Sequence, residues 1–366
     1  MPNTTFTYMS WNIQTYGPAK WYFNKIERVD AIALTIHFSG ASLVSIMELN
    51  ANLAPAILTS IVNQLNAIHG VLTLAQDWAW ESVPGNAAGT TGADEAYGFL
   101  YRTGILTVET SPGGTSVCGR STTDRLGNPL RFPNRSSATG NGRKPAYCAF
   151  RENTNNNLFS VVTYHAPYSA QAITGTQSVG QVREVYEVNT ADPGAAANWV
   201  AVTASLISGD FNENYPDPNT YGRILNGPPN GPGGTATILE NSTVRAFDSN
   251  PPFPPHWAPS VWWRVSAYDN IFCTGAAVPV ALGILDMISE LGQWTAGSDA
   301  NFPPPNGWPA AAAGLYSFNI PQPFDLVQEQ PGTTLVTRPL NVPADAWLFY
   351  RMCLSDHLPA RVQVTI

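Results

Sequence analysis

The segment Leu354-Ser355-Asp356-His357-Leu358, near the C-terminal end of the chain, places a carboxylate beside an imidazole directly after an apolar run. Metal-assisted hydrolysis of a phosphoester needs such a pair at the rim of a sheet. By itself a Ser-Asp-His tripeptide is weak evidence, because its residues are common. Four further short polar segments also lie at the ends of apolar runs and give it weight: Ser10-Trp11-Asn12-Ile13, Ile46-Met47-Glu48-Leu49, Tyr164-His165-Ala166-Pro167 and Ser208-Gly209-Asp210-Phe211-Asn212.

The composition predicts one large, strand-rich domain with many turns. Of the 366 residues, 44% are hydrophobic and 12% are charged, which is enough apolar material for a sizeable core. The 30 Gly and 31 Pro favour irregular connections over a helical bundle, and the 14 Tyr and 11 Trp favour strands. Because we find no internal repeat and no clear linker, we expect a single domain over residues 1–366, with loop insertions near 214–259 and 274–346.

Hydrophobic periodicity predicts a mixture of strands and helices. Residues 6–12 alternate apolar and polar side chains like a half-buried strand, whereas residues 28–38 and 53–68 carry their apolar residues at helical spacing. The same patterns predict further strands over 43–47, 97–101, 146–151, 158–164, 200–208 and 260–273, and further helices over 178–188 and 278–291.

The charge distribution is acidic overall but contains one basic segment. The net charge of −8 disfavours a protein that coats nucleic acid non-specifically, although it is compatible with a nuclease that has a local basic patch. Two interpretations of the basic segment stay open, a solvated loop face and an arm that faces a polyanion. The segment contains seven of the 18 basic residues: Arg120, Arg125, Arg131, Arg135, Arg143, Lys144 and Arg151.

The four cysteines form neither a disulfide scaffold nor a Cys-x-x-Cys metal pair. Cys118 and Cys148 flank most of the basic segment and would close it in an exported protein, whereas buried free thiols are the alternative. We find no signal peptide in this chain and no apolar run of transmembrane length, so we expect a soluble protein without stable membrane insertion. The few Lys and the many Asn, Thr and Trp are compatible with export, and the compartment stays open.

Oxygen ligands at several strand ends predict a metal site. Carboxylates in such positions can meet at one rim of a sheet, whereas scattered surface acids would not follow buried runs. Each residue taken singly is explained as a turn residue or cap, but together they predict a site for Mg²⁺, with Mn²⁺ or Ca²⁺ as alternatives and zinc disfavoured. The candidate ligands are Asn12, Glu48, Asp210, Asn212 and Asp356.

Two of the five histidines, His165 and His357, lie at similar strand ends. Either can act as a general acid or base, or can neutralise charge on a phosphoryl oxygen. Each needs a carboxylate that fixes its tautomer, and Asp269 and Glu95 are the candidates. The other three histidines are interpreted as ordinary surface or core residues.

The order of these motifs along the chain resembles that of the endonuclease/exonuclease/phosphatase superfamily. The series Trp-Asn, Glu, His, Gly-Asp-Phe-Asn, Tyr-Asp and Ser-Asp-His runs in this order between Tyr8 and Val364. Tyr164-His165-Ala166-Pro167 and Gly142-Arg143-Lys144-Pro145-Ala146 are most similar to the deoxyribonuclease I branch. The resemblance implies an α/β fold, a four-layered α/β sandwich with two mainly antiparallel sheets face to face and helices outside.

The resemblance also implies which residues handle the metal ion and the water. Glu48 and Asn12 would hold the catalytic metal, with Asp356 nearby. Asp210 and Asn212 would align the attacking water and the scissile phosphate, and Asn212 would hydrogen-bond a phosphate oxygen.

Two histidine–carboxylate pairs follow from the same resemblance. His165 would pair with Glu95 and His357 with Asp269, and Arg143 would contact the phosphate of the substrate. The residues themselves do not decide which histidine orients the water and which one serves the leaving oxygen.

The chain departs from the family pattern near its metal-binding Glu. Met47 stands where the family usually has Gln, and the sequence Leu49-Asn50-Ala51 offers no Arg to enter a DNA minor groove. The insertions are also longer than a minimal nuclease needs. These departures leave the predicted chemistry intact and bear on the substrate.

The sequence therefore predicts a divalent-metal-dependent phosphodiesterase, a monomer that acts as an endonuclease on DNA. An alternative within the same chemistry is a lipid or soluble phosphoester as substrate, such as sphingomyelin or an inositol phosphate. The Trp-rich insertions would then touch a membrane, although packing beneath long loops explains them more simply. A non-catalytic binding module is the second class, and the presence of every polar segment disfavours it.

Overall fold

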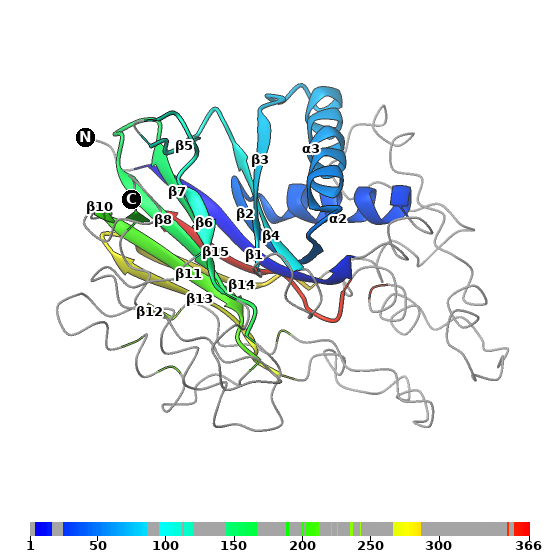
Figure 1. Ribbon diagram of the computed structural model, residues 1–366. Helices are drawn as coiled ribbons and strands as arrows, with labels where there is room; N and C mark the ends of the chain where they lie inside the picture. Colours follow the sequence, from blue (N-terminus) through cyan, green and yellow to red (C-terminus); the bar gives the residue numbers. More distant parts are fainter. Residues whose placement is uncertain are drawn as a thin grey trace, which may run out of the picture.

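The protein folds around two β-sheets that pack face to face, with helices against one of them (Figure 1). In this computed structural model, the described residues are 4–16, 25–85, 95–111, 113–120, 144–166, 202–212, 266–286 and 355–366, together with 188–189, 199–200, 221, 225, 235–236, 242 and 350. The expected two-sheet α/β sandwich is confirmed.

Among the described residues, the first sheet has six strands, which include the first and the last described strand of the sequence. Its order is β14-β15-β1-β2-β4-β3. Only β1 and β2 run parallel, and β1 pairs antiparallel with β15, so that Ser10 lies opposite Ala360. This pairing brings the Ser-Asp-His segment, which precedes β15, beside the polar end of β1. The strands are β1 (Thr5–Tyr16), β2 (Leu43–Asn50), β3 (Trp78–Pro84), β4 (Glu95–Arg102), β14 (Val278–Ile284) and β15 (Ala360–Thr365).

In the part of the chain that the structure describes, the second sheet has seven strands in the order β12-β13-β11-β8-β7-β5, with β6 paired to β7. Only β8 and β11 run parallel, which makes both sheets mainly antiparallel as expected. The strands are β5 (Leu106–Val108), β6 (Cys118–Arg120), β7 (Ala146–Glu152), β8 (Leu158–Thr163), β11 (Ala204–Asp210), β12 (Thr235–Ala236) and β13 (Asp269–Gly275). Two short strands, β9 (Val188–Asn189) and β10 (Trp199–Val200), pair with each other.

Helices α2 (Lys25–Ser39) and α3 (Ala54–Val71) lie on the side of the first sheet that faces away from the second (Figure 1). In α3, Ile57, Ile61 and Leu65 recur at helical spacing and are all buried, so this face packs on the sheet. Pro55 in the first turn is tolerated because a backbone N–H there has no partner within the helix. Within the described residues, no helix is long and apolar enough to span a bilayer.

The core is shared between the inner faces of both sheets. Phe6 of β1 packs on Phe159 of β8, with ring centroids 5.4 Å apart, and both side chains are buried. Toward the polar ends of β1 and β11, the interface between the two sheets contains hydroxyl groups. The hydroxyl of Tyr8 in β1 lies 2.7 Å from Ser45 Oγ in β2 and 2.6 Å from Ser208 Oγ in β11, so one buried phenol bridges the sheets.

Most of the predicted elements are present, but the helix expected over 278–291 is wrong. Residues Val278–Ile284 form strand β14, which pairs antiparallel with β15. Val278, Val280 and Leu282 alternate with smaller residues, Pro279 and Gly283 disfavour a helix, and β15 offers an edge for pairing. This part of the expected 274–346 insertion thus belongs to the first sheet.

Several other predictions fall on residues that are not described. The helix expected over 178–188 lies outside the described residues apart from residue 188, which is in β9. Most of the two expected insertions and Arg143 also lie outside them. Strand β3 was not expected, although its alternation of Trp78, Trp80 and Ser82 with other residues is compatible with a strand.

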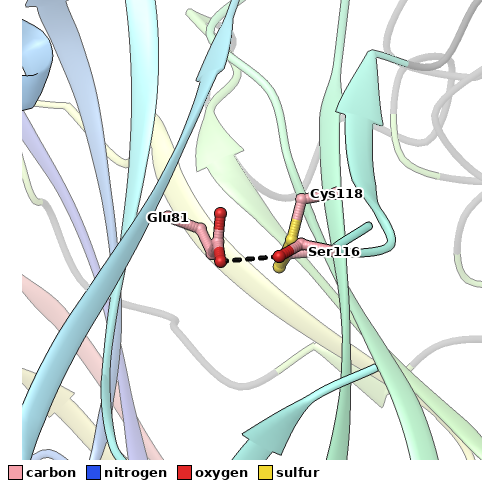
Figure 2. Close-up of a disulfide and its surroundings, with 4 residues drawn as sticks. Glu81, Ser116 and Cys118 are labelled. Atoms are coloured by element: carbon pink, nitrogen blue, oxygen red, sulfur yellow. Dashed lines mark hydrogen bonds between the residues drawn. A yellow bond between two sulfur atoms is a disulfide. The ribbon is translucent and has the colours of Figure 1, made fainter. Parts of the chain in front are cut away.

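A disulfide joins Cys118 of β6 to Cys148 of β7 (Figure 2). The two residues lie directly opposite each other in the β6–β7 register. Two residues earlier, Ser116 Oγ donates a hydrogen bond of 2.8 Å to Glu81 Oε1 of β3, so the β6 segment is attached to both sheets. Of the two interpretations of these cysteines, the structure has the disulfide.

Gly209 lets two neighbouring strands of the second sheet approach closely just before the polar end of β11. Its φ is +155°, and a Cβ atom built on it would lie 1.9 Å from the carbonyl oxygen of Tyr164. The neighbouring backbone bonds, Tyr164 N–H to Ser208 O and Ala166 N–H to Asp210 O, hold His165 beside Asp210. A side chain at position 209 would push these segments apart.

We therefore expect Gly209→Ala to lower the free energy of unfolding by about 2–4 kcal/mol, because backbone atoms must move to relieve the clash. Chemical denaturation monitored by circular dichroism measures the change. Gly113→Ala is the matched control, since the nearest atom to its Cβ would be Ser111 Oγ at 3.8 Å. Equal stabilities of the two variants would contradict the close approach.

Candidate active site

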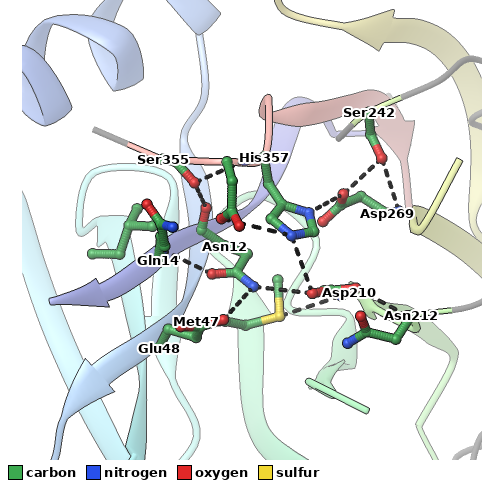
Figure 3. A network of polar contacts seen from close by, with 12 residues as sticks. Asn12, Gln14, Met47, Glu48, Asp210, Asn212, Ser242, Asp269, Ser355 and His357 are labelled. Carbon is green, nitrogen blue, oxygen red and sulfur yellow. Dashed lines mark hydrogen bonds and ion pairs between the residues drawn. The ribbon is translucent and has the colours of Figure 1, made fainter. Parts of the chain in front are cut away.

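The polar segments predicted from the sequence converge at one rim between the two sheets (Figure 3). Asn12 and Glu48 come from β1 and β2 of the first sheet, whereas Asp210 and Asp269 come from β11 and β13 of the second. His357 precedes β15, and its side chain points between the sheets toward Asp210 (Figure 3). Segments that are far apart in the sequence therefore build one cluster.

Glu48 is directed into the cluster by an irregularity in β2. The register of β2 against β4 shifts between Ile46 and Leu49, and Glu48 has a φ of +64°. A non-glycine residue in this left-handed region is strained, and such strain concentrates at functional sites. The bulge turns the Glu48 carboxylate toward His165, whose Nε2 lies 3.4 Å from Glu48 Oε1.

Asp210 is the central carboxylate and is only 1% exposed. Its Oδ2 atom lies 3.0 Å from Asn12 Nδ2, 3.4 Å from His357 Nε2 and 3.6 Å from His165 Nε2. Burial raises the pKa of Asp210 above its ordinary value, although the nearby His357 opposes the shift. A carboxyl group of raised pKa between two imidazoles is suited to proton transfer.

His357 forms the expected pair with Asp269. Its Nδ1 lies 2.7 Å from Asp269 Oδ2, and this oxygen also accepts a hydrogen bond of 2.6 Å from Ser242 Oγ. Burial disfavours the charged ring, but the carboxylates of Asp269 and Asp210 outweigh this effect and raise the pKa of His357 to about 9. The ring is therefore protonated at neutral pH in the metal-free protein.

His165 forms the second expected pair, with Glu95 at the start of β4. Its Nδ1 lies 3.0 Å from Glu95 Oε2, and its backbone N–H donates to the hydroxyl of Tyr97 at 3.1 Å. The other ring nitrogen, Nε2, faces the carboxylate oxygens of Glu48 and Asp210. A lone pair there would repel both oxygens, so this geometry calls for an N–H or a cation between them.

Asn12 lies in the cluster but presents the nitrogen of its amide. Its Nδ2 donates to Glu48 Oε1 at 2.9 Å and to Asp210 Oδ2 at 3.0 Å, while its Oδ1 accepts the backbone N–H of Gln14 at 2.9 Å. This differs from the expected oxygen ligand. Asn12 joins two carboxylates through this nitrogen, and its role as an oxygen ligand stays a prediction.

Three further residues were predicted for the site: Asn212, Asp356 and Arg143. Asn212 adopts a φ of +52°, and its Nδ2 donates to Ala166 O at 2.7 Å, which leaves the second amide hydrogen for a substrate oxygen. Asp356 lies at the edge of the cluster, with Oδ1 3.8 Å from His357 Nε2. Arg143 lies outside the described residues, so its role as a phosphate contact stays a prediction.

Several supporting residues were not predicted from the sequence. Ser355 bonds both Asn12 O and His357 N–H, which fixes the Ser-Asp-His turn against β1. Trp11 Nε1 and the hydroxyl of Tyr350 both donate to His357 O, at 2.9 and 2.8 Å. Ser355 and Trp11 are members of the motifs and could have been found from sequence, whereas Tyr350 looks like an ordinary core aromatic.

Two groups of side chains in the cluster could hold a divalent metal ion, and they share Asp210. One is Glu48, His165 and Asp210, and the other is Asp210, Asp269 and His357, with the ligand atoms of each group within 4.8 Å of one another. Carboxylate oxygens outnumber imidazoles, which suits a hard cation such as Mg²⁺ or Mn²⁺. The residues present therefore fit the expected metal ion, and Asp356 belongs to neither group.

Comparison with known proteins shows the fold. No family model and no curated protein sequence matches the chain. An endonuclease/exonuclease/phosphatase family protein from Bacteroides thetaiotaomicron superposes with a TM-score of 0.52 at 13% identity, covering 100% of this chain and 98% of that one. A mannosyl-6-phosphatase from the same species gives 0.51 at 12% identity, covering 99% and 100%. A functionally unknown conserved protein from Enterococcus faecalis gives 0.51 at 14% identity, covering 98% of each chain.

We expect His357 of the metal-free protein to titrate near pH 9, and Asp269→Asn to lower that pKa because the largest favourable partner is lost. NMR of the ring nitrogens measures this directly. Since the folded-state pKa lies above the ordinary value of 6.5, the stabilisation is fully present below pH 6.5 and is lost as the pH rises through about 9. A neutral His357 ring at pH 7.5 in the metal-free protein would contradict the raised pKa.

Proposed function

We propose that this chain is a divalent-metal-dependent phosphodiester hydrolase and that it acts as an endonuclease on DNA. The observation that carries the proposal is the convergence on Asp210 of two imidazoles, His165 and His357, each bonded to its own carboxylate. Hydrolysis of a phosphodiester needs an oriented water, a proton acceptor, a proton donor and positive charge near the phosphate. The cluster offers a group for each of these tasks.

The metal ion would be held by the carboxylate of Glu48, which belongs to one candidate group together with Asp210. When bound, a divalent ion supplies positive charge that polarises the phosphate and stabilises the departing oxyanion. The positions of both carboxylates are fixed by Asn12, whose amide nitrogen bonds each of them.

The protein's own groups would handle the protons. Asp210, whose pKa is raised by burial, accepts a hydrogen bond from a water and takes its proton as the water attacks. His357, which is protonated at neutral pH, donates from Nε2 to a phosphoryl or leaving oxygen, while Asp269 holds Nδ1 and stabilises the charged ring. His165, held by Glu95, would serve the opposite side of the phosphorus.

A polynucleotide is favoured as substrate by the basic residues that cluster between Arg120 and Arg151. The runner-up is a lipid or soluble phosphoester. It has support from the mannosyl-6-phosphatase, because that protein shares the fold and its name denotes a phosphatase. The proposed protein is a monomer with a nucleic acid as its partner and without membrane insertion.

The test is nicking of a supercoiled plasmid with Mg²⁺, Mn²⁺ or Ca²⁺, run beside release of phosphate from a sugar phosphate and of phosphocholine from sphingomyelin. We expect nicking that is abolished by a chelator. His165→Gln and Asp210→Asn should each lower kcat by about 10²–10⁴-fold, the usual contribution of a positioned proton donor or acceptor.

His37→Gln is the matched control, because His37 lies in α2 and has no contact with the cluster among those described for it. It should retain the wild-type rate. If only the sugar phosphate or only sphingomyelin is hydrolysed, that compound and not DNA is the substrate. Failure to cleave any phosphoester with any of the three ions would refute the enzymatic proposal.

A further inference from the structure

A buried arginine near the start of α2, Arg28, lies beside the end of β1 that carries Asn12. Its side chain is only 1% exposed, and its Nη2 atom donates hydrogen bonds to the backbone oxygens of Ile13 and Gln14. We propose that Arg28 is a positioning residue, whose guanidinium holds the turn after Asn12 and thereby aims the Asn12 amide at the two carboxylates of the site. This inference rests on the proposed function, because it names a residue on which the hydrolytic site depends.

The backbone after Asn12 departs from a regular strand. From Asn12 to Tyr16, the register advances by four residues along β1 but by only two along β2, and the residue of β2 inside this irregularity is Glu48. Gln14 has a φ of +48°, which is strained for a residue with a side chain. Such a bulge interrupts the ladder of hydrogen bonds and points side chains in a new direction. The bulge therefore needs support from outside the sheet, and Arg28 supplies hydrogen bonds to two of its carbonyl oxygens.

Hydrogen bonds lead from this turn to the carboxylates of the site (Figure 3). Gln14, whose carbonyl oxygen lies 3.3 Å from Arg28 Nη2, donates its backbone N–H to Asn12 Oδ1 at 2.9 Å. That bond fixes which way the amide faces, so its nitrogen donates to Glu48 Oε1 at 2.9 Å and to Asp210 Oδ2 at 3.0 Å. A change at Arg28 is therefore transmitted through the turn to both carboxylates.

Packing alone does not account for a guanidinium at this position. The neighbouring residues Val29, Ile32 and Ile36 of α2 are buried and belong to the main apolar core. A buried charge is costly unless its hydrogen bonds are satisfied, and apolar residues of similar size often give equal or greater stability. The carbonyl oxygens that Arg28 binds identify what an apolar side chain could not do there, which is to hold the bulge in the conformation that the site needs.

The test follows the hydrogen bonds of the Asn12 amide in the metal-free protein. NMR with isotopically labelled asparagine measures how fast the Nδ2 hydrogens exchange with water, and the signal is assigned by its loss in Asn12→Ala. We expect Arg28→Met to accelerate this exchange about tenfold, the effect of losing one hydrogen bond to a carboxylate. Arg28→Lys keeps the charge on a stem that is one atom shorter, so its rate should lie between those of the wild type and Arg28→Met.

Kinetics on plasmid DNA separate positioning from binding. We expect kcat of Arg28→Met to fall about 10–100-fold, because the carboxylates are displaced from their working positions. KM should change less than about twofold, since the contacts that bind DNA are not altered.

Thr35→Val is the matched control. Thr35 is buried in the same helix, and its Oγ1 donates to Ala31 O at 2.8 Å, so this variant also loses a buried hydrogen bond. Its exchange rate at Asn12 and its kcat should equal those of the wild type. Unfolding midpoints measure how much stability each variant loses.

Unchanged exchange at Asn12 in folded Arg28→Met would overturn the inference while the hydrolase stands. If Arg28→Met does not fold, Arg28→Lys decides by the same comparison with the wild type. An equal acceleration in Thr35→Val would also overturn the inference, because any loss of stability in α2 would then have the same effect. If the wild-type protein hydrolyses no phosphoester, the proposed function fails and the exchange rate at Asn12 alone decides the inference.

Discussion

The buried carboxylate of Asp210 is the point on which the arrangement of the site depends. It is held from the first sheet by Asn12 and is approached by His165 and His357, so groups from both sheets meet at one oxygen atom. A buried charge is stable only when it is surrounded by donors or cations. The packing of the two sheets, the absence of a side chain at Gly209 and the turn before β15 all serve to deliver those partners.

Beneath this cluster the two sheets are joined by hydroxyl groups. An interface between two packed sheets is ordinarily apolar. Tyr8, Ser45, Ser208 and Thr163 form one buried set of hydrogen bonds between the first and second sheets. Such bonds are directional, whereas apolar contacts are not, so they fix how far the sheets can slide against each other. The distance between Glu48 and Asp210, which lie on opposite sheets, is thereby kept constant.

The two-sheet sandwich was predicted through the family resemblance, which rests on the order of the motifs. The positions of polar residues after apolar runs were sufficient to name most of the residues that lie in the cluster. Polar residues at strand ends could be predicted to converge, because strand ends at one rim are close in space. The orientation of Asn12 could not be predicted, since it depends on a hydrogen bond from the backbone of Gln14. Ser242 and Tyr97 act through contacts across long sequence separations, and no local pattern marks them. Strand β14 was missed because a short apolar run is compatible with either a helix or a strand until its pairing edge is known.

The pairing of β1 with β15 also has a consequence for the order in which the site is assembled. Thr5 lies opposite Thr365. The first sheet is therefore complete only when β15, the last described strand, has paired with β1, the first one. His357, one of the two histidines beside Asp210, precedes β15 by only a few residues. During synthesis on the ribosome, the described strands β1, β2, β11 and β13 therefore emerge before the ring of His357. The cluster around Asp210 can therefore assemble only after His357 has left the ribosome and β15 has paired with β1.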